Sequence, residues 1–169
     1  MKLFSGFKTS IDLTPGRFRL MKDDIERFEL KYSDWFSSDA ATQFNGQTIA
    51  IRPKNIWNSK FDIFKDNQDC GDIIFNWRGH VIIRLTRVDD GSEDEFLLRH
   101  RGILNTRYEL ISAQASHILT LTANYNWSKF KYYYSVDNEN HDFPDIVLEE
   151  FLIYCGFAAN LHMSRSGTL

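Results

Sequence analysis

The sequence is poor in residues that interrupt or cross-link a chain. Its 169 residues include three prolines, nine glycines and two cysteines. So little proline and glycine argues against a disordered or collagen-like chain. The two cysteines, Cys70 and Cys155, are too far apart in the sequence to suggest a metal site. We expect both to be buried, reduced thiols rather than a disulfide, as is usual in a reducing compartment.

Long hydrophobic runs and an excess of positive charge are also missing. No segment reaches the ~20 apolar residues that a membrane span needs, and residues 1–12 hold no apolar run of signal-peptide length. We therefore expect a cytoplasmic protein, at most peripheral to a membrane, and an unmodified sequon at Asn126-Trp127-Ser128. The net charge of −3 is unlike that of a nucleic-acid-binding domain, so we expect no nucleic-acid partner.

Aromatic residues, by contrast, are abundant at 15% of the chain, and they favour half-buried strands. Within residues 48–136, apolar and polar residues alternate in short runs separated by turn signals, without helical segments between them. This pattern predicts an antiparallel sandwich or barrel and not a parallel α/β fold. The residues predicted to face inward are Ile49, Ile51, Phe61, Ile63, Val81, Ile83, Leu85, Leu119, Leu121, Phe130, Tyr132 and Tyr134.

The segment 144–163, PDIVLEEFLIYCGFAANLHM, is apolar around its whole helical circumference. Such a helix must be enclosed by protein or by lipid, and Pro144 suits its first turn. We predict a mainly β fold, a closed antiparallel β-barrel wrapped around this buried hydrophobic C-terminal helix. The alternative is a helix that leaves the barrel and inserts into a membrane as a tail.

The chain is predicted to form one domain, 1–169, with residues 1–45 as an N-terminal extension. Residues 21–36 fit both the helical and the strand periodicity, and we favour a short helix there. Residues 99–102 are predicted to form a basic turn, and residues 89–95 an acidic, solvated loop. Residues 55–61 resemble 124–130; chance and a barrel of two similar halves, with Trp57 and Trp127 packed at equivalent strand entries, both stay open.

The order of these features resembles that of a known family. A basic strand end (Leu97 to Gly102), Tyr108-Glu109-Leu110, the run from His117 to Leu121, and Trp127-Ser128-Lys129-Phe130 precede the terminal apolar helix. Over residues 45–163 this order is similar to the tubby C-terminal-like superfamily, which includes the tubby, phospholipid-scramblase-like and LURP-one-related proteins. The chain most resembles its small uncharacterised bacterial members.

This resemblance implies a closed barrel threaded by a hydrophobic C-terminal helix. Tubby proteins bind phosphoinositide headgroups through basic residues on the outer surface of the barrel, but none of those positions transfers one by one to this chain. The cysteine-rich palmitoylated segment of the scramblase-like members is absent, so the resemblance does not extend to lipid-moving activity.

The sequence contains no motif of an enzyme or of a metal site. A phosphate-binding loop, GxGxxG and the nucleophile elbow GxSxG are all missing. The five histidines lie singly, without metal-ligand spacing: His80, His100, His117, His141 and His162. Glu149 and Glu150 are expected in the first turns of the helix, where the helix dipole favours acidic residues and the barrel mouth is wet. We predict no catalytic residue, no cofactor and no metal.

Basic residues on outward-facing strand positions are the remaining candidates. If the inward set is as predicted, the exterior carries Arg84, Arg99, Arg101, Lys129 and Lys131, which form either one cationic surface or an ordinary barrel exterior balanced by the acidic loop. Such a surface binds phosphate headgroups. The first hypothesis is therefore a non-enzymatic tubby-like domain that binds an anionic membrane lipid or a protein partner. The second is an enzyme with a site in the barrel mouth or a surface pocket, using Glu149 or a histidine.

Overall fold

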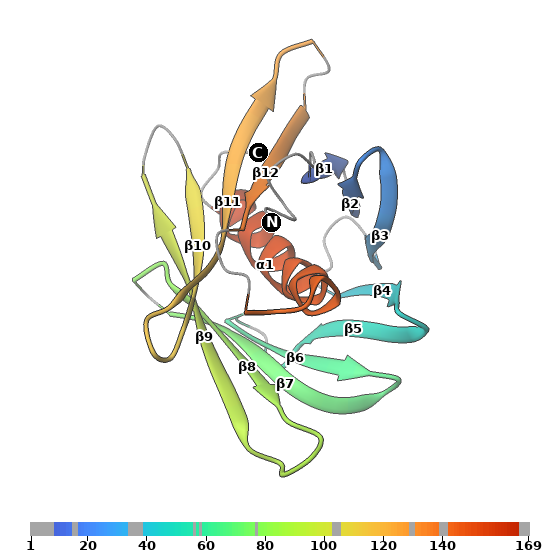
Figure 1. Cartoon of the computed structure of the whole chain (residues 1–169), viewed down its shortest axis with the longest axis vertical. Helices are drawn as coiled ribbons and strands as arrows, with labels where there is room; N and C mark the ends of the chain where they lie inside the picture. Colours follow the sequence, from blue (N-terminus) through green and yellow to red (C-terminus); the bar gives the residue numbers. More distant parts are fainter. Residues whose placement is uncertain are drawn as a thin grey trace.

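In the computed structural model, the described residues form twelve strands followed by one helix (Figure 1). The described residues are 9–14, 17–33, 39–55, 57, 59–76, 78–102, 106–128, 131–138 and 142–165. The strands are β1 Thr9–Thr14, β2 Arg17–Lys22, β3 Ile25–Tyr32, β4 Ala40–Phe44, β5 Gln47–Pro53, β6 Lys60–Lys65, β7 Gln68–Phe75, β8 Val81–Thr86, β9 Glu93–Arg101, β10 Arg107–Ser112, β11 His117–Asn126 and β12 Lys131–Asp137. The helix, α1, spans Asp145–Arg165.

The strands follow one another in a single antiparallel meander. From β2 to β12, each strand pairs with the next one in the chain. β1 pairs along the whole of β2 and also lies beside β12, with Ser10, Ile11 and Asp12 in register with that strand. Figure 1 shows the sheet curving around α1. The prediction of a mainly β, antiparallel fold with one C-terminal helix is thus confirmed.

The inner face of the sheet follows the predicted alternation. Nine of the residues predicted to face inward are at most 2% exposed: Ile49, Ile51, Phe61, Ile63, Val81, Ile83, Leu119, Leu121 and Tyr134. Leu85 is half-buried and packs against them. The side chains of Phe130 and Tyr132 lie outside the described residues. The alternation of apolar and polar residues was therefore sufficient to predict which face of the sheet carries the core.

Helix α1 fills the concave side of the sheet. Every residue from Phe151 to Ala159 is buried, as expected for a helix without a polar face. Pro144 directly precedes the helix, and its carbonyl accepts the first helical hydrogen bonds from the N–H groups of Val147 and Leu148. A residue at this position donates no helical hydrogen bond, so the N–H that proline lacks is not needed. The helix begins one residue later and ends two residues later than predicted.

The prediction of a helix within residues 21–36 is wrong, and so is that of an extension outside the sheet. Residues 25–32 form β3, which pairs with β2 across a two-residue turn. Both turn residues, Asp23 and Asp24, have positive φ, 52° and 62°, the conformation of the tight hairpin turns that suit twisted strands. Phe28 and Leu30 face the core. The local sequence fits the helical and the strand periodicity equally, and burial of Phe28 and Leu30 selects the strand.

Two predicted loops are shorter than expected. Residues 99–101 belong to β9 and do not form a turn, because β9 pairs with β10 as far as Arg101 opposite Arg107. The acidic loop ends at Ser92, since β9 begins at Glu93 and pairs with Thr86. Both errors have one cause: the neighbouring strand continues the hydrogen-bonded ladder through polar residues that look like turn residues in isolation.

Candidate functional site

The predicted basic surface is neutralised where the structure describes it. Arg84 on β8 donates two hydrogen bonds to Asp72 on β7, at 2.8 and 2.7 Å, and Lys60 lies 2.9 Å from the same carboxylate. Burial raises the pKa of Asp72, but these hydrogen bonds outweigh it, and the net pKa is below its ordinary value. The charge of Arg84 is thus matched by a neighbouring strand.

Arg99 and Arg101 share a single carboxylate. Both lie on β9, and each Nε is 3.5 Å from Glu109 Oε2 on β10. Lys129 is outside the described residues, as is the side chain of Lys131 on β12. Lipid binding by these five residues stays a prediction. The described three do not form a cluster free of acidic side chains.

The two glutamates of α1 also have partners. Glu150 lies 2.6 Å from Lys65 and accepts a hydrogen bond from the Tyr154 hydroxyl at 2.8 Å. Glu149 is buried, with its side chain 4% exposed, so the expected wet position is wrong for this residue. Its carboxylate accepts two hydrogen bonds from Arg27, at 3.0 and 3.1 Å. These contacts fix the helix to the sheet and leave neither carboxylate free for acid–base chemistry.

Three of the five histidines come together at the C-terminal end of α1. The rings of His100 on β9 and His162 on α1 are 4.8 Å apart, and the Tyr108 hydroxyl lies 3.0 Å from His162 Nδ1. Burial, with further effects from His80 on His100 and from His100 and Arg165 on His162, lowers the pKa of both rings. No group of three potential ligands within the described residues has metal-site geometry. Sequence reasoning missed this cluster, because its members come from three separate parts of the chain.

The meander places alternate turns at opposite ends of the sheet, and the two ends differ in charge. We call the acidic end the one formed by turns 23–24, 45–46, 66–67, 87–92 and 113–116. At or next to these turns lie six acidic residues, Asp23, Asp24, Asp66, Asp89, Asp90 and Glu93, and three bases, Lys22, Lys65 and Arg87. Arg87 is itself bound to Asp94, at 2.7 and 2.8 Å. This end is therefore negative.

The opposite end carries the exposed tryptophans, and we call it the tryptophan end. Its described residues are 33, 39, 54–55, 57, 59, 76, 78–80, 102, 106 and 127–128, together with the last turn of α1. Trp57 is 81% exposed and Trp127 is 78% exposed. The Trp127 ring meets Tyr125 at the end of β11 edge to face, with centroids 4.7 Å apart, so both tryptophans remain on the surface. At or next to these positions, the described residues include the acid Asp39 and the bases Lys54, Lys60, Arg78, Arg101, Arg107 and Arg165. Three of these bases are paired on neighbouring positions of the sheet: Lys54 with Asp62, Lys60 with Asp72 and Arg101 with Glu109.

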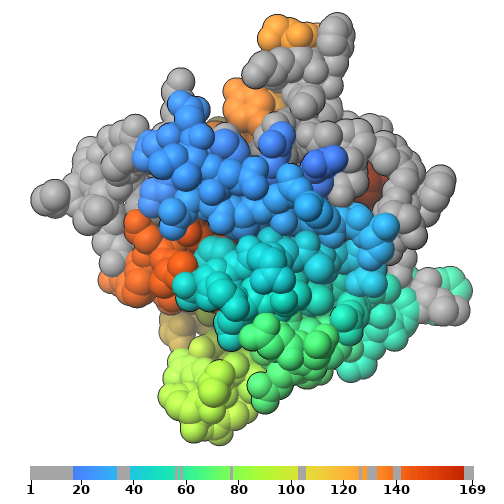
Figure 2. Space-filling model, turned by 90° about the vertical axis from the view of Figure 1, so that its right-hand side faces the viewer, coloured from blue at the N-terminus to red at the C-terminus, as the bar shows by residue number. Residues whose placement is uncertain are grey.

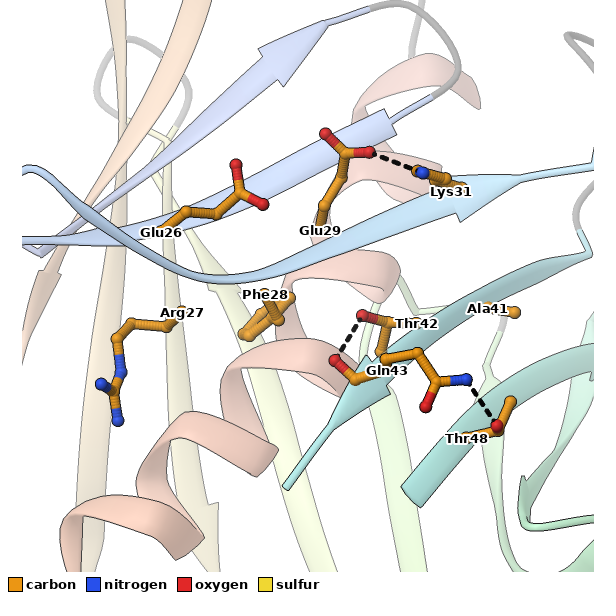
Figure 3. A pocket seen from close by; sticks show the side chains of 9 residues that line it. All are labelled: Glu26, Arg27, Phe28, Glu29, Lys31, Ala41, Thr42, Gln43 and Thr48. Atoms are coloured by element: carbon orange, nitrogen blue, oxygen red, sulfur yellow. Dashed lines mark hydrogen bonds and ion pairs between the residues drawn. The ribbon is translucent and has the colours of Figure 1, made fainter. Parts of the chain in front are cut away.

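One groove lies in the wall of the sheet, between β3 and β4 (Figure 3). It has a volume of about 420 Å³, and its lining residues are Glu26, Arg27, Phe28, Glu29, Lys31, Ala41, Thr42, Gln43 and Thr48. None of the nine is a histidine, cysteine or serine, and Glu29 is paired with Lys31 at 3.3 Å. The two hydroxyls in the lining bond to Gln43: Thr42 donates to the Gln43 carbonyl, and Thr48 accepts from the Gln43 side chain. The lining thus holds no hydroxyl–histidine pair of the kind used in covalent catalysis.

Figure 2 shows the same side of the molecule as a surface, with β2 and β3 in blue above the teal strands. The first turns of α1, in orange, reach the surface beside them, where Lys22 lies 3.0 Å from Asp145.

No family model, no curated protein and no solved structure matches the chain.

Proposed function

We propose that this protein is a non-enzymatic binding domain that docks on an anionic membrane surface through its tryptophan end. The observation that carries the proposal is the segregation of surface groups: exposed Trp57 and Trp127 lie at the end that is rich in bases, and exposed aspartates occupy the opposite end. The site shares Arg101 with the strand-face surface predicted from the sequence, and it differs from that surface in its two exposed tryptophans and in the bases Arg78, Arg107 and Arg165.

Tryptophan suits the membrane interface because its large ring is apolar while its N–H remains hydrogen-bonded at headgroup level. Trp57 lies between β5 and β6, and Trp127 lies between β11 and β12. The six strands β6 to β11 separate the two positions in the sheet. We propose that one flat membrane surface engages both rings. Each base near an anionic surface adds about 1 kcal/mol of attraction, and the acidic end orients the molecule away from the membrane.

The test is co-sedimentation with vesicles of phosphatidylcholine alone and of phosphatidylcholine mixed with phosphatidylserine. We expect binding to the mixed vesicles at low salt, weaker binding at high salt, and loss of most binding in the double variant Trp57→Ala/Trp127→Ala. The matched control is Ile25→Ala/Val88→Ala, which removes two exposed apolar residues near the acidic end, 63% and 102% exposed. Equal binding by both double variants would overturn the proposal, as would no binding by the wild type at low salt.

A membrane tail formed by α1 is the less favoured function. The helix is long and apolar enough to cross a membrane, but 67% of its most apolar window is buried inside the protein. Leaving the sheet would expose the apolar inner face of the sheet to water. We expect alkaline carbonate to extract all of the expressed protein without detergent; a detergent-requiring fraction would favour the tail.

We further propose that the sheet closes into a barrel through β1 and that the fold is of the tubby-like type. The support is the register of β1 with both β2 and β12, together with the helix enclosed by the sheet. Amide hydrogen exchange tests the closure. We expect the amides of residues 10–12 to exchange as slowly as those of their β12 partners, whereas rapid exchange would indicate an open sheet.

A further inference from the structure

The histidine cluster lies at the tryptophan end of the molecule. His80 directly precedes β8, His100 is the residue before the last one of β9, and His162 belongs to the last turn of α1. A Cβ atom added at Gly79 would lie 3.6 Å from His162 Nε2, so the turn between β7 and β8 packs against that edge of the ring. Any charge that the cluster gains is therefore gained at the end that carries the two exposed tryptophans.

Two buried tyrosines form the inner wall of the cluster. Tyr108 on β10 packs against both imidazoles, with ring centroids 5.4 Å from His100 and 5.7 Å from His162. Tyr134 on β12 meets Tyr108 edge to face at 6.1 Å, and its hydroxyl donates to Met163 Sδ at 2.7 Å. Burial raises the pKa of Tyr108, so this phenol stays neutral at physiological pH. The inner wall thus supplies no negative charge.

The charged groups that act on the two rings are basic. Burial first, and repulsion from His80 second, lower the pKa of His100. For His162, burial again lowers the pKa most, followed by repulsion from His100 and Arg165. Among the described residues, no carboxylate contributes to either pKa. Glu109 on β10 alternates with the inward Tyr108 and faces the outer side, where the two arginines of β9 share it. The cluster therefore holds positive charge without a counter-ion.

The cluster can take up a proton without losing a hydrogen bond. The Tyr108 hydroxyl oxygen lies 3.0 Å from His162 Nδ1 and 3.5 Å from the Ala159 carbonyl oxygen. In a protonated ring, the Nδ1–H donates to the Tyr108 oxygen, and the phenol hydrogen then donates to the Ala159 carbonyl. The rings of His100 and His162 are only partly buried, so protons reach them from solvent. Protonation therefore adds charge while these contacts persist.

We propose that the histidine cluster makes docking on an anionic membrane depend on pH, with stronger binding under acidic conditions. This inference rests on the proposed function of the tryptophan end. In free solution, repulsion among the rings and Arg165 opposes protonation. Anionic headgroups next to the same end offset that repulsion and favour the charged rings. Because linkage is reciprocal, protonation strengthens membrane binding by the factor by which the membrane favours protonation.

The test measures binding of the intact protein to vesicles of phosphatidylcholine mixed with phosphatidylglycerol, from about pH 7.5 down to about pH 5.5. The phosphodiester of phosphatidylglycerol stays ionised in this range, so the vesicle charge is constant. At low salt we expect binding about fivefold stronger at the lower pH for each proton taken up. High salt should shrink this ratio by screening. A ratio that high salt leaves unchanged would overturn the proposal, because apolar surface exposed by partial unfolding would then drive binding.

A cluster variant and a matched control assign the effect to these rings. His80→Gln/His100→Gln/His162→Gln should bind vesicles equally at both pH values. His117→Gln should keep the wild-type ratio, because His117 begins β11 next to the acidic end and its ring bonds to Thr120 at 2.8 Å. Circular dichroism at both pH values checks that the variants fold. A wild-type ratio in the folded cluster variant would overturn the proposal.

A second measurement needs no variant. Nuclear magnetic resonance follows the ring protons of His100 and His162 in the wild type, bound to lipid discs with and without phosphatidylglycerol. The pKa of these rings should rise when the anionic lipid is present, and unchanged pKa values would overturn the proposal. Equal vesicle binding of the wild type at both pH values would overturn this inference alone. Absence of binding at every pH would overturn the proposed membrane function and this inference with it.

Discussion

Arg27 on β3 and Glu149 on α1 form a bidentate ion pair that joins residues 122 positions apart, with donor–acceptor distances of 3.0 and 3.1 Å. The Glu149 side chain is 4% exposed and the Arg27 side chain 42% exposed. The hydrogen bond to Glu149 raises the pKa of Arg27. Lys22 lies 3.9 Å from the same carboxylate, so two bases from one hairpin hold the first turns of the helix.

The first prediction concerns this pair. Arg27→Ala should lower the free energy of unfolding by about 2 kcal/mol, because it leaves a nearly buried carboxylate with only a distant partner. Arg27→Ala/Glu149→Gln should be more stable than the sum of the single variants predicts, since removal of both charges leaves nothing uncompensated. Urea unfolding measures both. The control is Lys54→Ala, which breaks the more exposed pair with Asp62, 3.3 Å apart, and should cost less than about 0.5 kcal/mol. Additive effects would show that Arg27 and Glu149 are energetically independent.

A second prediction concerns Gly71 on β7. Its φ is 153°, and a Cβ atom there would lie 2.0 Å from the carbonyl oxygen of Arg84 on the paired strand β8. Gly71→Ala should therefore destabilise the protein by more than about 2 kcal/mol, because one of the two backbones must move. Gly91→Ala is the matched control, because φ is 70° and no atom lies within 4 Å of the added Cβ. The expected loss in the free energy of unfolding is about 1 kcal/mol, from the left-handed backbone conformation alone. Thermal unfolding compares them, and equal losses would contradict the close approach of β7 and β8.

The third prediction tests enclosure of the helix. Ala158 is fully buried, so Ala158→Arg should abolish soluble folding by placing an unpaired charge in the core, at a cost of more than about 4 kcal/mol. Ile146→Arg, on an exposed position of the same helix with 40% exposure, should fold normally. Soluble yield and circular dichroism provide the measurement. Near-normal unfolding of Ala158→Arg would mean that the sheet does not enclose α1.

The fourth prediction is a pH dependence from the histidine cluster. The pKa values of His100 and His162 lie below the ordinary 6.5 in the folded protein. At pH values between those lowered pKa values and 6.5, the unfolded chain binds more protons than the folded protein. The contribution of the two neutral rings to the free energy of unfolding is therefore fully present above pH 6.5 and is lost as the pH falls through the folded pKa values. The free energy of unfolding should therefore be smaller at about pH 5.5 than at about pH 7.5.

The groups that face these rings are His80, Tyr108 and Arg165. All are neutral or basic, so protonation adds repulsion and meets no carboxylate among them. His100→Gln/His162→Gln should flatten the pH dependence in this range, while His117→Gln, whose ring bonds to Thr120 at 2.8 Å, should leave it unchanged. A slope that persists in the double variant would assign the dependence to other groups.

The sequence by itself determined the parts of this protein that depend on local patterns. Alternation along β5, β6 and β8 identified the inward residues, and the uniformly apolar run after Pro144 identified a helix that needs enclosure. These predictions succeeded because the side-chain period of a strand or a helix is a property of neighbouring residues. The same reasoning failed for β3, where residues 25–32 satisfy both periods and burial against α1 selected the strand.

Only the tertiary structure decided which charged side chains form ion pairs and which surfaces stay exposed. Arg84 is bound to Asp72 and Glu149 to Arg27, so the charges that seemed available in the sequence are neutralised by residues on other elements. The collection of Trp57 and Trp127 at one end depends on the meander, and the groove depends on where the β3–β4 ladder stops. Each is a relation between strands, set by how the whole sheet curves around α1, and no local pattern encodes it.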